Sequence, residues 1–587
     1  MKRIFYALLF FLLYTYTSAN AQELWSANSS GSVLQKDINI DGNILILKSG
    51  SLHCLSKSTG NEVWSTKIDK AKSFVRISKS TLIQVLSETD TFIINITDGK
   101  ILYNSIEAKH ASPRIRYSSN RLLVWASGSN LTEAILLDKV SGEVLSKTKI
   151  ADGVAKELDT FLQPNGDFIV FSTFGVSYIT ASGKLNYNTP LKIAESAKQL
   201  AAYYTPTLKM FPTANPDHKA VIKDGYLLNL NIKTGQVNAE TELASALVTF
   251  DNLDEQQVII GGQIKKDLQL AVYDKSTCKE IRKGAIKVAN TGSILRHQND
   301  LFVISTSTVG GSTIKLVDFN TLALKADKTY KTGGQYLGTL FNSEKGIGVT
   351  SAYSINYFNP TSFESTGGTK HYIHSGKTNL EAGDDVYFFS NGYLGKVNKT
   401  KGEETLLYKD KLSVKLMEEE QPQLQLTEDG IIVVASQSVA KVDLNGNLVY
   451  NEHFAPPGPS AGSVLGNALL LAASSYLAVD AQEKSNASTS VSSKQYWTNE
   501  QKTFEAIGGE FGSKIRERFS KSANAMHYQV ILTKGDAGNF KLIKFNKQTG
   551  KVDGELLVDS RTPDYVFDPV ESTIYLFTAD SIKAKKI

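Results

Sequence analysis

Apolar and polar positions alternate in short runs along nearly the whole chain. Continuous apolar runs such as "NILILKSG" and "RLLVWASG" are followed by shorter alternating runs that end in Asp or Asn, such as "AILLDK" and "LAVYDK". A period of two residues, with many β-branched and aromatic side chains between regular turn residues, is typical of short β-strands. We therefore expect an all-β fold.

A turn with a recurring sequence separates these strands. In "STGNEVWSTKI", which spans Ser58–Ile68, a Thr-Gly pair supplies the positive φ that tight hairpin turns need. Comparable turns contain Gly60, Gly99, Gly142, Gly183, Gly235, Gly402, Gly446 and Gly550. Cys278 stands in the place of the glycine in one unit, and two units near Leu322 and Ser362 are degenerate. Most turns follow one another after about 42 residues, which indicates a repeat architecture.

An aromatic residue recurs four residues after the glycine of several turns. These residues are Trp64, Tyr103, Tyr187 and Tyr450. One large ring at a fixed place in a repeat indicates a packing contact between neighbouring units. The alternative is a stack of rings that binds an aromatic ligand.

About forty residues with four short strands is the size of one β-propeller blade. The turns and the last unit together predict about twelve four-stranded blades. Because single rings usually have four to eight blades, we expect two rings in tandem, divided between Thr291 and Gly348. One irregular ring is the alternative.

The repeat, an apolar run followed by x-G-x-L-x-x-L-D-x-x-T-G-x-x-x-W, resembles the PQQ-like β-propeller repeat family. The similarity is strongest at Asn43–Ile68 and Leu542–Leu557 and weak between Asp318 and Ser365. The resemblance implies the propeller fold. The quinone-dependent enzymes with this repeat have an adjacent pair of cysteines, whereas Cys54 and Cys278 stand alone here. No residues match the quinone or calcium sites of those enzymes, so we expect neither cofactor nor metal.

The two ends of the chain complement each other. The last unit, "STIYLFTADSIKAKKI", stops before its glycine turn, and "QELWSAN" resembles the missing outer strand. A strand lent by the N-terminal end would protect an exposed sheet edge. We predict that residues near Trp25 pair with the strand that contains Tyr575 and Phe577.

The N-terminus has the features of a signal peptide. Lys2 and Arg3 precede the apolar segment "IFYALLFFLLYTYT", and Ala19-Asn20-Ala21 fits a cleavage site that leaves Gln22 first. We expect residues 1–21 to be removed, with a retained membrane anchor as the alternative. No cysteine follows the cleavage site, so we expect no lipoprotein-type anchor. The mature chain would reside in the periplasm, at the outer membrane or at the cell surface.

Composition narrows the classes of partner. The 587 residues carry a formal net charge of +5, and 41% are hydrophobic. This small charge gives no support for nucleic-acid binding, which needs a concentrated basic face. Two cysteines in an exported chain of this length do not make a disulfide framework, and we expect two separate thiols.

One long interruption separates Gly446 from Gly550. It begins with the breaker "APPGPSAG", continues with the uncharged stretch Ser463–Val479, and ends with Asn499–Ala525, which has an apolar stripe at helical spacing. We predict a helical hairpin at 455–526 that contacts a partner protein or, less strongly indicated, the membrane. Its candidate partner-binding residues are Leu465, Leu469, Tyr476, Phe504, Ile507, Phe511, Ile515 and Phe519. The alternatives are that Ala468–Asp480 forms two more blade strands, or that the hairpin plugs its own ring.

Three short motifs resemble catalytic or metal sites. "GPSAG" around Ser460 lacks the strand and the α/β sheet that a nucleophile elbow needs. "DINIDG" at Asp37–Gly42 begins like a calcium loop, but its twelfth position is Lys48, so we interpret it as a turn. His371 and His374 lack a third zinc ligand. We therefore expect no catalytic or metal residues.

These observations favour a non-enzymatic exported propeller that acts as a protein–protein interaction scaffold in the bacterial cell envelope. It is similar in kind to the propeller component of the outer-membrane barrel-assembly machinery, which implies an envelope protein complex as partner. The expected parts are propeller portions at 22–300 and 301–454, the insertion at 455–526, and the last blades at 527–587. The alternatives are a propeller that binds a ligand or polysaccharide, and a degenerate quinone-dependent dehydrogenase.

Overall fold

The computed structural model describes residues 22–456 and 527–587, except for short gaps at 30, 40, 78–79, 106–109, 119, 164, 195–207, 246–247, 265–266, 289–290, 307–311, 327–335, 352–353, 363, 374–377, 417–419 and 536–537. The regular elements of this part are all β-strands. The predicted signal peptide at 1–21 lies outside the described residues. So does the predicted helical hairpin, apart from Ala455 and Pro456, together with every candidate partner-binding residue on it.

The first four blades each contain four strands in sequence order. Blade 1 has β2 (Val33–Ile38), β3 (Ile44–Lys48), β4 (Ser51–Leu55) and β5 (Glu62–Lys67). Blade 2 has β6 (Ala71–Arg76), β7 (Leu82–Ser87), β8 (Thr91–Asn95) and β9 (Ile101–Asn104). Blade 3 has β10 (His110–Tyr117), β11 (Arg121–Gly128), β12 (Thr132–Asp138) and β13 (Val144–Ala151). Blade 4 has β14 (Glu157–Leu162), β15 (Phe168–Ser172), β16 (Gly175–Ile179) and β17 (Leu185–Pro190).

The next four blades repeat this arrangement. Blade 5 has β18 (Leu208–Pro212), β19 (His218–Lys223), β20 (Tyr226–Asn231) and β21 (Val237–Glu242). Blade 6 has β22 (Val248–Asn252), β23 (Gln257–Ile264), β24 (Asp267–Asp274) and β25 (Glu280–Lys287). Blade 7 has β26 (Thr291–His297), β27 (Asp300–Thr306), β28 (Ser312–Asp318) and β29 (Leu324–Ala326). Blade 8 has β30 (Tyr336–Ser343), β31 (Gly346–Ser351), β32 (Ile355–Phe358) and β33 (Ser365–Gly368).

Two of the last four blades differ from the others: blade 11 has three described strands, and blade 12 includes a strand from the N-terminal end. Blade 9 has β34 (Asn379–Ala382), β35 (Asp385–Ser390), β36 (Tyr393–Asn398) and β37 (Glu403–Leu406). Blade 10 has β38 (Gln423–Thr427), β39 (Gly430–Val434), β40 (Ser438–Asp443) and β41 (Leu448–His453). Blade 11 has three strands among the described residues, β42 (Tyr528–Lys534), β43 (Phe540–Asn546) and β44 (Lys551–Val558). Blade 12 joins β45 (Asp564–Asp568), β46 (Thr573–Phe577) and β47 (Ser581–Lys586) to β1 (Glu23–Asn28).

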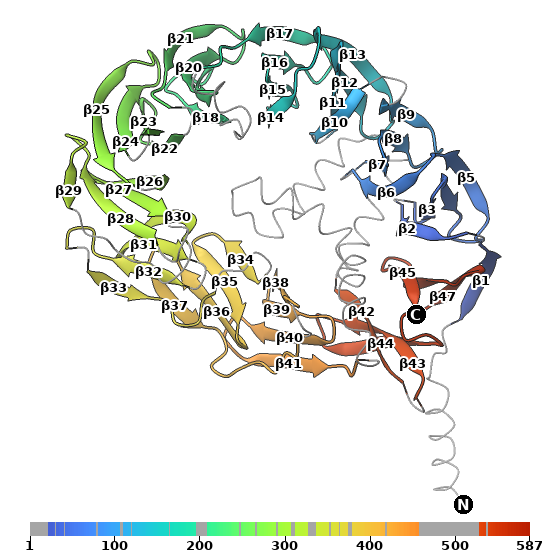
Figure 1. Cartoon of the computed structure of the whole chain (residues 1–587). Helices are drawn as coiled ribbons and strands as arrows, with labels where there is room; N and C mark the ends of the chain where they lie inside the picture. The colour runs from blue at the N-terminus through green and yellow to red at the C-terminus, as the bar shows by residue number, and fades with distance from the viewer. Residues whose placement is uncertain are drawn as a thin grey trace, which may run out of the picture.

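The strands of every blade pair antiparallel and follow one another from the centre of the ring to its periphery (Figure 1). The prediction of an all-β propeller with about twelve blades is therefore confirmed. Within blade 11 the glycine turn lies between β43 and β44, as it lies between the third and fourth strands elsewhere. Its described strands thus occupy the second, third and fourth positions.

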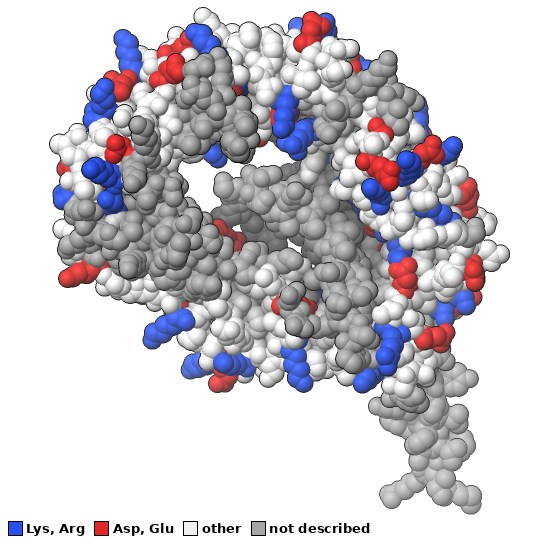
Figure 2. Space-filling model, viewed as in Figure 1, with Lys and Arg blue, Asp and Glu red and all other residues white. Residues whose placement is uncertain are grey.

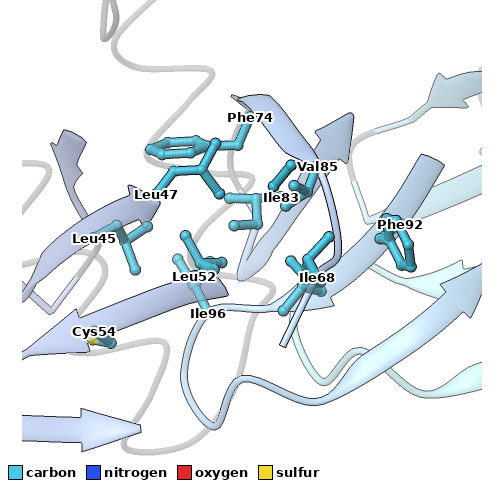
Figure 3. Close-up of a cluster of buried hydrophobic side chains, with 12 residues drawn as sticks. Leu45, Leu47, Leu52, Cys54, Ile68, Phe74, Ile83, Val85, Phe92 and Ile96 are labelled. Atoms are coloured by element: carbon cyan, nitrogen blue, oxygen red, sulfur yellow. The ribbon is translucent and has the colours of Figure 1, made fainter. Parts of the chain in front are cut away.

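Hydrophobic cores lie between blades and explain the continuous apolar runs. In β3, Leu45 and Leu47 face the core shared with blade 2, whereas Ile44 and Ile46 face the core shared with blade 12. Both faces of the strand are covered, so successive residues are all apolar. Figure 3 shows the first of these cores, in which side chains such as Ile83 are fully buried.

These cores form one closed series among the described residues. Twelve clusters each join one blade to the next, and the cluster with Ile44, Tyr575 and Ile582 joins blade 12 to blade 1. The blades accordingly follow one another around a single ring (Figure 1). The prediction of two rings is not confirmed, because its basis was the usual blade number and not any contact between residues.

The closing strand is where the sequence placed it, but its neighbour differs. β1 pairs with β47, with Trp25 opposite Ala584, and not with β46, which contains Tyr575 and Phe577. Trp25 still contacts the strand β46 through its side chain, because the ring centres of Trp25 and Tyr575 lie 5.8 Å apart. The chain ends are therefore adjacent, and a strand from one end completes the blade of the other.

Both cysteines are free and buried, as expected for two separate thiols. Burial is the main cause that raises the pKa of Cys54 and of Cys278, in each case to about 12. Because the thiolate is the reactive form, we expect no reaction of the native protein with a thiol-specific disulfide reagent at pH 8 and two reacting thiols in guanidinium. A Ser58→Cys variant, with its new thiol on an exposed turn, should react natively at one site; rapid reaction of native wild-type protein would contradict the buried placement.

Candidate functional site

A clasp between neighbouring blades recurs at four turn glycines, Gly60, Gly99, Gly235 and Gly550. In it, an aromatic ring on the outermost strand of one blade lies on the turn glycine of the next. A Cβ atom on Gly99 would come within 2.5 Å of the Trp64 ring, and one on Gly235 within 2.4 Å of the Tyr187 ring. The same side chains donate hydrogen bonds to carbonyls of that turn, at 3.1 Å from Trp64 Nε1 to Ile96 O and at 2.9 Å from the Tyr187 hydroxyl to Ile232 O. The prediction that the recurrent aromatics are packing contacts is confirmed.

Two turns without glycine keep the backbone but change the packing. Cys278 and Leu322 take left-handed φ values of 54° and 55°. Facing Cys278, blade 5 presents the small Ala239, whose carbonyl lies 3.5 Å from the Cys278 Sγ atom. Facing Leu322, blade 6 presents Gly284, where a Cβ would come within 2.4 Å of the Leu322 carbonyl oxygen. A side chain on the turn is therefore matched by a smaller residue on the neighbouring blade.

Between blades 6 and 7 the clasp has reversed chemistry. Arg282 stands four residues after Cys278, where several units have an aromatic residue and others have Ser146 or Ala239, and the turn of blade 7 supplies an aromatic residue, Phe319. The guanidinium carbon of Arg282 lies 4.1 Å from the centre of the buried Phe319 ring, and that of Arg296 on β26 lies 4.0 Å from it. Two arginines thus contact one ring by cation–π interaction.

An open groove lies beside this cluster, between the innermost strands of blades 6 and 7. Its volume is about 380 Å³, and it is lined by Asp251, Asn252, Leu253, Leu295, Arg296 and Gln298. Asp251 Oδ2 accepts a hydrogen bond from the Arg296 backbone N at 2.9 Å, which joins the two walls. Gln298 takes a left-handed φ of 52°, whereas the corresponding turn of blade 1 uses Gly42. Strained backbone of this kind is concentrated at functional sites.

Charged groups around the groove are partly removed from water. Burial raises the pKa of Asp251, against the opposing effect of backbone hydrogen bonds from Arg296 and Asn252. Burial, and then the charge of Arg296, lower the pKa of Arg282. The Nε atom of Arg282 is buried without a hydrogen-bond partner among the described residues. Because a guanidinium stays protonated at neutral pH, this corner of the ring holds two positive charges, and the Asp251 carboxyl lies close enough to Arg296 to interact with one of them.

The buried Lys275 side chain contacts the groove through Asn252. It is fully buried, and its Nζ donates to Asn252 Oδ1 at 2.6 Å and to Pro212 O at 2.9 Å. Burial lowers the pKa of Lys275, while the nearby Asp254 and Glu255 raise it. The lysine fixes the orientation of the Asn252 amide and ties the groove to blade 5.

The arrangement is suited to recognition of an oxyanion. Arg296 uses its Nε to donate to Gln298 O at 3.0 Å, and its ring contact fixes the guanidinium plane. No hydrogen bond involves its two Nη atoms within the described residues. A fixed guanidinium with free donors binds carboxylate or phosphate in two-point geometry.

The motifs tested in the sequence have ordinary structural roles where they are described. Asn39 Oδ1 accepts hydrogen bonds from the backbone N atoms of Asp41 and Asn43, which makes the predicted turn between β2 and β3. His371 Nδ1 lies 2.8 Å from Glu404 Oε1. Ser460 and His374 lie outside the described residues. No group of three or more His, Cys, Asp or Glu side chains is placed to hold a metal ion in the described part of the chain.

The visible face of the ring carries interspersed acidic and basic side chains around an opening near its middle (Figure 2). This mixture agrees with the small net charge and shows no field of one sign. Among the described residues, the chain contains no helix with the length and apolar character needed to cross a bilayer.

No family model matches the chain, and no curated protein sequence matches it. Similar solved structures include dihydro-heme d1 dehydrogenase NirN in complex with DHE, with 12% identity, a TM-score of 0.29, and coverage of 58% of this chain and 77% of that chain. BamB from Moraxella catarrhalis has 14% identity, a TM-score of 0.23, and coverage of 48% and 83%. AztD from Citrobacter koseri has 11% identity, a TM-score of 0.27, and coverage of 56% and 94%. At these TM-scores the similarities do not bear on ring size, ligand or partner.

The sequence pattern did not indicate Arg282, Phe319 or Arg296 as candidate site residues. Cys278 interrupts the glycine pattern, but Ser146 and Ala239 also interrupt the aromatic pattern, so Arg282 does not stand out in the sequence.

Proposed function

We propose that the chain is a non-enzymatic exported β-propeller that acts as a protein–protein interaction scaffold in the bacterial cell envelope. One observation carries this proposal: among the described residues the ring is closed by inter-blade cores, and the residues on both sides of segment 457–526, Ala455 and His527, are hydrogen-bonded to one blade. Loops and insertions on such a rigid frame are preorganised for binding, so that less conformational entropy is lost when a partner docks.

The described ends of the inserted segment are anchored in blade 11. Ala455 O accepts hydrogen bonds from Lys534 N at 3.2 Å and from the Thr533 hydroxyl at 2.9 Å. His527 O accepts one from Lys547 N at 2.6 Å. The described residues on both sides of 457–526 are therefore hydrogen-bonded to the same blade. We propose that the apolar residues of the insertion, among them Leu469, Phe511 and Phe519, bind an envelope protein complex associated with the outer membrane.

Deletion of Gly462–Ala525, with a short Gly-Ser bridge in its place, tests the scaffold function. We expect a folded variant that no longer co-purifies with its envelope partner at a stoichiometric level, because the ring contacts around Ala455 and His527 remain. Thermal unfolding and co-purification from solubilised envelopes measure the two effects. A matched variant that replaces Gln482–Ser493 with a Gly-Ser segment of equal length should retain the partner. A deletion variant that cannot fold would show that the segment belongs to the core, and retention of the partner would show that it binds elsewhere.

A further inference from the structure

The groove between blades 6 and 7 departs from the repeat in several independent ways. It has an open volume, a cation–π cluster on Phe319, a left-handed Gln298, and an Arg282 Nε atom that is buried without a partner among the described residues. Four other inter-blade contacts place an aromatic ring on a turn glycine, whereas this one places two guanidinium groups on the Phe319 ring. We propose that this groove binds a carboxylate of a partner protein, next to an apolar side chain, through the terminal Nη groups of Arg296. This proposal rests on the scaffold function and adds a second contact to it.

Arg296 is the residue that would touch the carboxylate. Its Nε donates to Gln298 O, and its guanidinium carbon lies 4.0 Å from the centre of the Phe319 ring, so these two contacts restrict the orientation of the guanidinium. A planar carboxylate matches two adjacent N–H donors, and such a charge-assisted pair is stronger than neutral hydrogen bonds. Arg282 positions Phe319 from the other blade and adds positive charge.

The walls of the groove select the class of ligand. Leu253 and Leu295 give it an apolar side, which suits the side chain next to an acidic residue in a peptide. Asp251 lies in the same groove, and Asp254 and Glu255 are close enough to Lys275 to raise the pKa of that lysine. These carboxylates repel a polyanion such as a uronic-acid polysaccharide, and they repel doubly charged phosphate more than a single carboxylate. A peptide with one acidic residue between apolar residues fits best.

The test uses the full chain and a fluorescein-labelled peptide, acetyl-Ala-Leu-Glu-Leu-Ala-amide, in fluorescence anisotropy at low salt. We expect the glutamine version of the peptide to bind at least tenfold more weakly. We expect Arg296→Gln to weaken binding of the glutamate peptide at least tenfold, and Arg296→Lys about fivefold, because lysine keeps the charge but loses the two-point geometry. The matched control is Arg561→Gln, which removes an arginine 6.0 Å from the Phe540 ring in blade 11 and should change binding less than twofold.

Competition distinguishes the possible ligands. Unlabelled glutamate peptide should displace the probe at lower concentration than inorganic phosphate or trigalacturonate. Tighter competition by either anion would overturn the assignment to a protein partner. Equal binding of the glutamate and glutamine peptides by the wild-type chain would overturn the site itself, even if an arginine variant failed to fold. Either result leaves the deletion experiment on the insertion unaffected, so failure of this site is distinguishable from failure of the scaffold function.

Discussion

Removal of β1 (Glu23–Asn28) is expected to lower the thermal unfolding midpoint strongly and to cause self-association. Trp25 contacts the Tyr575 ring, lies on Gly60 and donates from Nε1 to Lys57 O at 2.8 Å, so it connects blade 12 to blade 1. Trp25 is only partly buried, so loss of its ring contacts alone costs less than the ~3–5 kcal/mol of a fully buried aromatic side chain. The deletion also exposes β47 as an unpaired edge, and such edges pair with other chains.

The experiment compares the mature chain with a variant that begins at Ser29. Unfolding is followed at one fixed scan rate, because chains of this size often unfold irreversibly. The synthetic peptide Gln22–Ser29 should restore the midpoint and the monomer when it is added in excess. The same peptide with Trp25→Ala is the matched control and should restore little. An unchanged midpoint in the deletion variant would show that the ring does not depend on this strand.

The variant Gly550→Ala is expected to destabilise the protein by about 2–5 kcal/mol. Its φ of +71° is a left-handed conformation, which costs a residue with a Cβ about 1–2 kcal/mol. The new Cβ would also come within 2.6 Å of the Tyr450 ring, and overpacking costs about 1–3 kcal/mol more.

Two control glycines separate these effects. Gly383 has a φ of +63° but no atom within 4 Å of an added Cβ, so Gly383→Ala should show the backbone cost alone. Gly50 has neither a positive φ nor a close neighbour, and Gly50→Ala should be nearly neutral. All three close neighbours of the Cβ at position 550 belong to Tyr450, so Gly550→Ala should cost less in a Tyr450→Ala background. Equal effects of Gly550→Ala and Gly383→Ala would contradict the clasp.

Most of the local structure was predictable because its causes lie within a few residues. The turn acids accept hydrogen bonds from backbone N atoms two and three residues on, as when Asp274 Oδ1 accepts from Ser276 N at 3.0 Å and from Thr277 N at 2.8 Å. The next residue of the turn takes a left-handed backbone conformation, which glycine adopts without strain, and this explains why glycine recurs there. The unit with Cys278 in place of glycine keeps the same left-handed backbone, so it could still be recognised as a repeat unit from its other residues.

The candidate site was not predictable in the same way. Arg282, Phe319 and Arg296 belong to three different strands or turns, and each one alone resembles an ordinary residue of its unit. Only the packing of blade 6 on blade 7 brings the two guanidinium groups to one ring.

By itself, the sequence determined the strands, the turns, the number of blades and the strand exchanged between the chain ends, because these depend on alternation, turn chemistry and the length of the repeat. The tertiary structure alone decided that twelve blades close in one ring, that β1 pairs with β47, and that the groove beside Arg296 exists. Ring closure depends on the rotation between neighbouring sheets, summed over every inter-blade core. That rotation arises from how side chains such as Leu47 and Ile83 pack across an interface, and no local pattern in the chain records it.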